Sequence, residues 1–72
     1  MWDQDLIQSP DSVKWVRLGA GYTQMECSYE CGIDSAAIVN AERDFPLKPL
    51  DTNEWNTMKR ICYKRIFDGL IV

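Results

Sequence analysis

The chain has 72 residues, with eight basic and eleven acidic side chains and a formal net charge of -3. A chain of this length buries only roughly 60% of the surface that it exposes when unfolded, so we expect one small domain over residues 1–72. The acidic charge gives no general attraction to nucleic acid or to an anionic membrane. The sequence has no run of about 18 apolar residues and no basic secretory start, so we expect a cytoplasmic protein that does not enter a membrane.

The chain contains three cysteines and no histidine. Cys27 and Cys31 are close together in the sequence, whereas Cys62 is distant from both. A structural zinc site usually takes four ligands, so we expect no metal and interpret the thiols as small apolar core side chains in a reducing compartment. The sequence has no nucleophile–base pair, glycine-rich phosphate loop or repeat, so we expect neither an enzyme nor a bound cofactor.

The first helix is predicted to start at Ser9 and Pro10. The serine hydroxyl can cap free backbone N–H groups, and proline at the first helical position removes a donor that would have no partner. The helix should run to about Leu18, because glycines follow at positions 19 and 21. Residues 1–8 precede it as an N-terminal arm, whose apolar side chains either pack on the domain or contact a partner.

The next segment, residues 23–42, has the spacing of a helix-turn-helix. The pattern from Thr23 to Glu26 matches a capping box, which starts a helix. Gly32 suits the left-handed conformation that ends a helix, and Asp34 is a good N-cap for a third helix over 35–42. Two short helices joined by about three residues that include a glycine are typical of this motif.

A last, amphipathic helix is predicted after a proline-containing loop, with Asp51 or Thr52 as its cap. Its apolar side chains recur at helical spacing and should face the core: Trp55, Met58, Ile61, Cys62 and Ile66. Its basic side chains fall on other faces, where we expect them to be solvated, with contacts to nucleic acid as the alternative: Lys59, Arg60, Lys64 and Arg65. We expect the helix to stop near Gly69. The apolar tail 68–72 would then fold back on the core or be covered by another chain, as in a homodimer.

The joint spacing of these elements resembles the Cro/CI-type (lambda-repressor-like, XRE) helix-turn-helix family. The matching positions span roughly residues 13–60 and include Val16-Arg17, Gly21-Tyr22-Thr23-Gln24, Glu26-Cys27-Ser28, Gly32-Ile33-Asp34, Ile38, Glu42 and Pro49. The resemblance implies an all-α domain of four to five helices. It also implies a structural ion pair between Arg17 and Glu42, which would tie the first helix to the third.

The same resemblance implies DNA contacts at particular positions. Gln24 would contact a phosphate, and Asp34, Ser35, Ala36 and Asn40 would point at base edges. In the loop after the third helix, Arg43 and Lys48 are the bases that would reach DNA. One hypothesis is therefore a conventional Cro-type repressor that binds operator DNA as a homodimer.

The charge of the helix-turn-helix segment favours a different hypothesis. Between Thr23 and Asp44 the sequence has five acids and one base, Arg43, although phosphate binding requires lysine or arginine. An acidic face suits a basic protein partner, so we favour an anti-repressor, or modulator, of the kind that temperate phages encode beside a CI-type repressor. The residues assigned to this partner-binding face are Met25, Glu26, Glu30, Asp34, Ala36, Val39 and Asn40. The alternative is that these acids are ordinary solvent-exposed residues that keep their helices hydrated and bind no partner.

Overall fold

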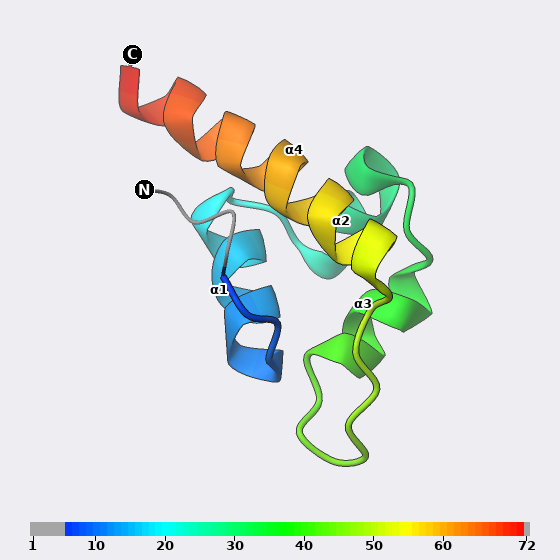
Figure 1. Cartoon of the computed structure of the whole chain (residues 1–72). Helices are drawn as coiled ribbons and strands as arrows, with labels where there is room; N and C mark the ends of the chain where they lie inside the picture. Colours follow the sequence, from blue (N-terminus) through cyan, green and yellow to red (C-terminus); the bar gives the residue numbers. More distant parts are fainter. Residues whose placement is uncertain (1–5, 72) are drawn as a thin grey trace.

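The computed structural model describes residues 6–71, and all regular secondary structure in that range is helical (Figure 1). The four helices in the described range are α1 (Pro10–Gly19), α2 (Gln24–Cys31), α3 (Ser35–Ala41) and α4 (Thr52–Ile71). The prediction of a small all-α domain is therefore confirmed. No helix in this range is long and apolar enough to cross a membrane. Residues 1–5, which belong to the predicted N-terminal arm, and residue 72 of the predicted tail lie outside the described residues.

The predicted helix starts and turns are confirmed by local hydrogen bonds. Thr23 Oγ1 accepts from the N–H of Glu26 at 3.1 Å, and Glu26 Oε1 accepts from the N–H of Thr23 at 2.8 Å. Gly32 ends α2 with a φ of 67°, and the side chain of Asp34 caps α3. Helices α1 and α4 also begin with capping boxes. The pair is Ser9 and Ser12 for α1, and Asp51 and Glu54 for α4.

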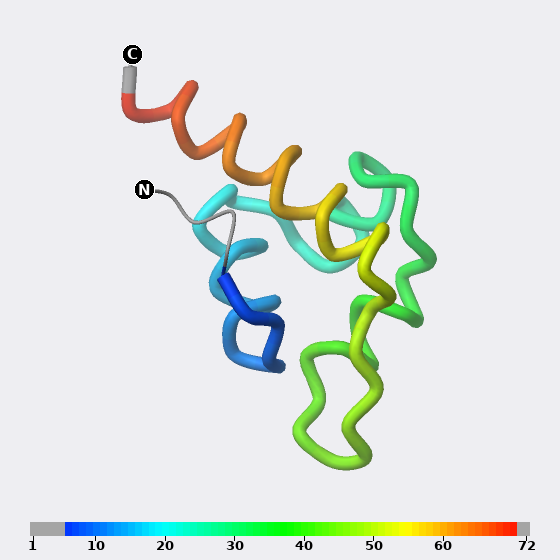
Figure 2. The backbone as a smooth tube through the Cα atoms, in the orientation of Figure 1, coloured from blue at the N-terminus to red at the C-terminus, as the bar shows by residue number. Residues whose placement is uncertain are grey.

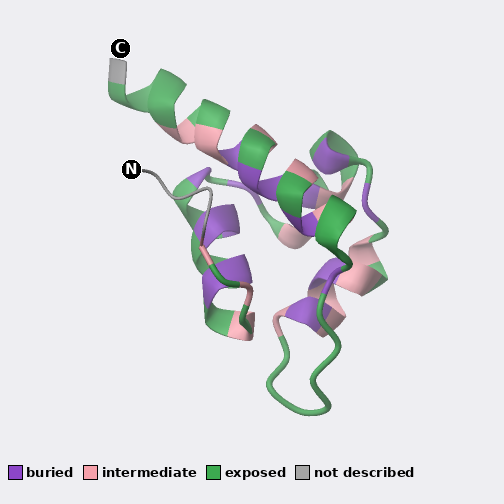
Figure 3. Cartoon of the chain, viewed as in Figure 1, coloured by how far each residue is buried: buried purple, intermediate pink, exposed green. Residues whose placement is uncertain are grey.

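The hydrophobic core lies among the four helices. Helix α4 packs on α1 and α2, and α3 packs on α2 and α1. The loop between α3 and α4 projects away from this body (Figure 2). Figure 3 shows that buried residues line the inner faces of all four helices; the largest that are fully buried are Val13, Ile38 and Met58.

The described part of the N-terminal arm packs on the domain. The indole N–H of Trp55 donates to the carbonyl of Leu6 at 3.1 Å. The side chain of Gln8 exchanges two hydrogen bonds with the backbone of Leu50, at 3.0 and 2.7 Å. Leu6 and Gln8 thus follow the first of the two alternatives for the arm, whereas the side chain of Ile7 is 83% exposed. These contacts fix the start of α4 against the segment that precedes α1.

The predicted end of the last helix was wrong. Helix α4 continues through Gly69 to Ile71, and the glycines with positive φ in the described range are Gly21 and Gly32. A glycine weakens a helix but ends it only where the chain takes a left-handed turn. Leu70 is 74% exposed, so it does not fold back on the core. Cover of this end by a second chain stays a hypothesis.

The prediction that the basic residues of α4 are solvated was wrong for Lys59, whereas Arg65 is exposed but still makes contacts with the domain. Lys59 is 7% exposed, and its ammonium lies 5.3 Å from the centroid of the Trp55 ring. The guanidinium of Arg65 lies 4.8 Å from the Tyr22 ring, and its Nε donates to the carbonyl of Ala20 at 2.7 Å. Long basic side chains bury their stems along apolar surface and stack on aromatic faces. These two cations therefore contribute to the fold.

The turn between α2 and α3 requires a positive φ at Gly32, and this requirement can be tested by substitution. Gly32→Ala should lower the free energy of unfolding by about 1 kcal/mol, because a Cβ is disfavoured at its φ of 67°. Gly69→Ala is the matched control, since a Cβ there has no neighbour within 4 Å and the position is helical. It should leave stability unchanged or slightly raised. Urea unfolding followed by circular dichroism measures both; equal losses would contradict the assigned turn.

Candidate interaction surface

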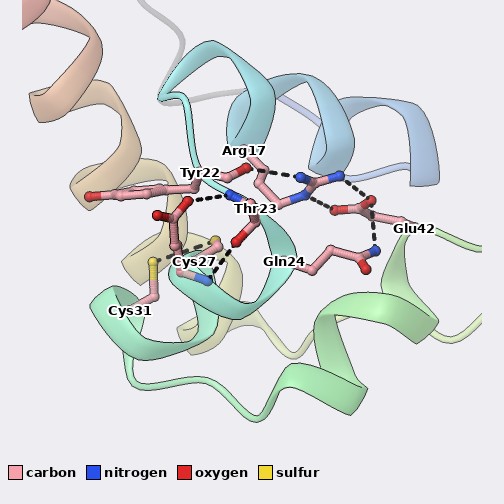
Figure 4. Close-up of polar contacts among 8 residues, drawn as sticks. Arg17, Tyr22, Thr23, Gln24, Cys27, Cys31 and Glu42 are labelled. Atoms are coloured by element: carbon pink, nitrogen blue, oxygen red, sulfur yellow. Dashed lines mark hydrogen bonds and ion pairs between the residues drawn. The ribbon is translucent and has the colours of Figure 1, made fainter.

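The ion pair implied by the family resemblance is present in the structure. Arg17 Nε donates to Glu42 Oε2 at 2.6 Å, and Arg17 Nη2 donates to Glu42 Oε1 at 2.9 Å (Figure 4). Arg17 Nη1 donates to the carbonyl of Tyr22 at 2.9 Å. The two side chains are only 9% and 7% exposed. The hydrogen bond to Glu42 raises the pKa of Arg17 above its ordinary value, against the opposing effect of burial. One guanidinium thus joins α1, the α1–α2 connection and the end of α3.

The Arg17–Glu42 pair also holds Gln24, the residue that the resemblance assigns to a phosphate. Its amide Nε2 donates to Glu42 Oε1 at 3.3 Å, as Figure 4 shows. The side chain is half-buried. Gln24 therefore begins α2 facing the end of α3, with its amide already engaged.

The sides of α2 follow from the rotation of about 100° per residue in a helix. Gln24 and Ser28 face α3, since Gln24 bonds Glu42 and Ser28 bonds the carbonyl of Ile33. Cys27 and Cys31 lie on the neighbouring face of the helix, and both are buried in the core. The outer half of the helix, which carries Met25, Glu26, Tyr29 and Glu30, is exposed.

The exposed residues of α2 divide into an apolar and an acidic pair. Met25 and Tyr29 follow directly after the α3-facing positions, so they border α3, and they are 70% and 85% exposed. Glu26 and Glu30 lie one step further around the helix. The sequence reasoning included Met25 but missed Tyr29. Its signal was available, because Tyr29 lies one helical turn after Met25 and therefore on the same face.

Helix α3 completes the candidate surface. Ile38 and Ala41 are buried, whereas Ala36 is exposed and Ser35, Val39 and Asn40 are half-buried. Asp34 is exposed at the turn, and its Oδ1 accepts from the N–H of Ala36 at 3.4 Å. We call the following set the α2–α3 surface: Met25, Glu26, Tyr29, Glu30, Asp34, Ala36, Val39 and Asn40. This set is the predicted partner-binding face with Tyr29 added.

The charged groups of the α2–α3 surface are all acidic. The two bases assigned to DNA contacts, Arg43 and Lys48, are exposed but lie in the loop after α3. Glu30 lines a groove together with Tyr22, Lys64 and Arg65, so basic residues share its surroundings. Burial raises the pKa of the Tyr22 phenol above 10, with a smaller contribution from Glu30 and opposition from Arg65. Glu26 and Asp34 therefore carry the charge of this surface most directly.

No family model, curated protein or solved structure matches this chain. The Cro/CI resemblance rests on the residues quoted for it, and it remains a prediction. Since a fold alone does not assign a function, the function must be argued from the chemistry of the α2–α3 surface.

The Arg17–Glu42 pair generates a stability prediction. Arg17→Ala should lower the free energy of unfolding by about 3 kcal/mol, because it leaves the shielded Glu42 carboxylate and the Tyr22 carbonyl without their donor. Lys64→Ala is the control, because it removes an exposed ion pair: Lys64 Nζ and Asp68 Oδ2 are 4.0 Å apart, and both side chains are strongly exposed. An exposed pair contributes under about 1 kcal/mol. Chemical unfolding of both variants tests this; similar losses would show that the buried pair is not the tie between α1 and α3.

Proposed function

We propose that this chain is a small modulator of transcription, an anti-repressor, whose α2–α3 surface binds the basic DNA-binding face of a repressor protein. The observation that carries the proposal is the exposed apolar pair Met25 and Tyr29 between α3 and the acids of α2. Tyrosine and methionine are enriched at the centres of protein interfaces. An acidic border around such a centre suits a partner of positive charge.

The charge of the surface supports a protein partner over nucleic acid. DNA affinity rests largely on lysine and arginine contacts to phosphates. Glu26, Glu30 and Asp34 would instead repel phosphates at close range. Two of the basic residues on α4 stack on aromatic rings, and Arg65 also bonds a backbone carbonyl. They are therefore not a free cationic stripe that would compensate for the acids.

A repressor is the partner class that this surface fits best. Its DNA-binding face must present several bases to the phosphate backbone, so it offers a complementary potential. The helix-turn-helix resemblance supports the same class, because it implies a regulator of the Cro/CI type. Binding there would block operator DNA from the repressor by direct competition. Direct operator binding by this chain is the competing function, through Ser35 and Asn40 on α3 with Arg43 and Lys48 beside them.

A charge-neutralised variant separates these two functions without disturbing the helix caps. Glu26→Gln and Asp34→Asn keep capping groups, because glutamine serves in a capping box and asparagine serves as an N-cap. Together with Glu30→Gln they should slow association with a CI-type repressor and flatten the salt dependence of that association. Surface plasmon resonance at several salt concentrations measures both effects.

The control for the charge variant is Glu54→Gln, which makes the same change in the capping box of α4, outside the α2–α3 surface. It should leave association unchanged. The proposal fails if the unmodified chain alone binds the adjacent operator DNA at nanomolar concentration in about 0.15 M salt, the strength of ordinary specific DNA binders. In that case the neutralised variant should bind DNA more tightly, since it removes repulsion from phosphates.

The apolar pair makes an independent prediction about the lifetime of the complex. Tyr29→Ala should weaken repressor binding on the order of tenfold, mainly through faster dissociation, as for a central aromatic contact. Stability should change little, because Tyr29 is 85% exposed. Phe45→Ala is the matched control, since Phe45 is an aromatic residue that is 88% exposed in the loop after α3. Equal effects of the two variants would remove Tyr29 from the interface.

A further inference from the structure

All three cysteines of the chain meet in the core. Cys27 and Cys31 come from α2 and Cys62 comes from α4, and their three sulfur atoms lie within 4.8 Å of one another. The sulfurs of Cys27 and Cys31 are 3.9 Å apart and point toward each other (Figure 4). Cys27 and Cys62 are fully buried, and Cys31 is 8% exposed. This cluster was not predicted, because Cys62 is far from the other two cysteines along the chain.

We propose that Cys27, Cys31 and Cys62 form a three-sulfur binding site for a trivalent thiophilic ion, for which arsenic(III) is the probe. The site is separate from the α2–α3 surface and does not depend on the proposed function. The metal-free expectation from the sequence rested on counting four ligands for zinc. Three convergent sulfurs change that argument, because thiophilic ions that take three ligands need no fourth residue.

The spacing of the sulfurs suits a three-coordinate ion. Arsenic(III) keeps a lone pair, so its three bonds to sulfur are pyramidal. Bonds of about 2.3 Å, as for zinc and sulfur, then place the three sulfurs roughly 3.5 Å apart. The sulfurs of Cys27 and Cys31, 3.9 Å apart, are close to this value, and the other separations, all within 4.8 Å, must shorten when the ion binds. The sequence has no histidine, and among residues 6–71 no carboxylate joins the cluster. A closed tetrahedral zinc site would therefore lack a protein ligand.

Charge decides which three-coordinate ion the core accepts. Three thiolates around a trivalent ion form a neutral unit, whereas zinc(II) would leave one negative charge and copper(I) would leave two. Burying an uncompensated charge costs several kcal/mol or more. The nearby cation, Arg17, is already paired with Glu42. A trivalent ion is thus the one that this core can hold with all three sulfurs deprotonated.

The binding step balances without an oxidant or a reductant. Arsenous acid carries three hydroxyl groups; three As–O bonds break and three As–S bonds form. Each thiol proton leaves with a hydroxide as water, so three waters are released. Of the three cysteines, Cys31 alone keeps some exposed surface, at 8%, so it is the first nucleophile.

The test uses the full chain, reduced with a phosphine because dithiol reductants would compete for arsenic. After incubation with arsenite, native mass spectrometry should show one arsenic gained and three hydrogens lost per chain. X-ray absorption should show three sulfurs and no oxygen around the arsenic. The bound ion should raise the thermal midpoint, because it links α2 to α4. Zinc(II), offered at equal concentration, should not displace the arsenic.

Two variants locate the site. Cys62→Ala leaves two thiols, so any arsenic that it binds should retain a hydroxide, with affinity reduced at least tenfold. Met58→Leu is the control, since it alters the α4 core one turn away while keeping all three sulfurs and a similar volume; it should bind like the unmodified chain. Absence of arsenic, coordination by two sulfurs or displacement by zinc in the unmodified chain would each overturn the proposal, even if Cys62→Ala failed to fold.

Discussion

The fold depends on one guanidinium. Helices α2 and α3 have eight and seven residues, and isolated helices of such length are marginal in water, so tertiary contacts must hold them. Arg17 supplies three of those contacts, to both oxygens of Glu42 and to the carbonyl of Tyr22. Because Glu42 is the C-cap of α3 and Tyr22 immediately precedes the N-cap of α2, the same side chain sets both ends of the pair relative to α1. These contacts of Arg17 therefore determine how the α2–α3 surface is arranged.

The Arg17–Glu42 pair also reduces the negative charge that the helix-turn-helix segment exposes. Glu42 would otherwise add a fifth acid to the segment between Thr23 and Asp44, yet its carboxylate is compensated by Arg17 and nearly hidden from solvent. The remaining acids are exposed and lack an equivalent buried base. They add little to the fold beyond two helix caps, which are satisfied equally well by neutral amides. Their negative charge is therefore the property that needs a functional explanation, and a basic partner provides one.

What the sequence predicted well are features decided within a few residues. Three such features are the capping box at Thr23, the left-handed turn at Gly32 and the cap at Asp34. Each depends on neighbours at most three or four positions away, so the sequence pattern alone reveals it. The Arg17–Glu42 pair is distant along the chain and came only from the family resemblance. The burial of Lys59 was missed although its ring partner, Trp55, lies one turn away in the same helix. The cluster at Cys62 was missed because its partners, Cys27 and Cys31, come from α2. Periodicity places a residue on a face, but it does not say which thiol another helix brings there.

Helix α2 has two sides with different chemistry, and this connects the two proposals. Cys27 and Cys31 point into the core beside Cys62, and Met25 and Tyr29 point outward one or two positions away around the same helix. Such a short element moves as a unit, since it has barely two turns over which to bend. A bond between its inner side and α4 would therefore restrain the position of its outer side. If a trivalent ion fills the sulfur cluster, the affinity of the α2–α3 surface for its partner should respond to that ion, and by thermodynamic linkage the partner should change the affinity for the ion by the same factor.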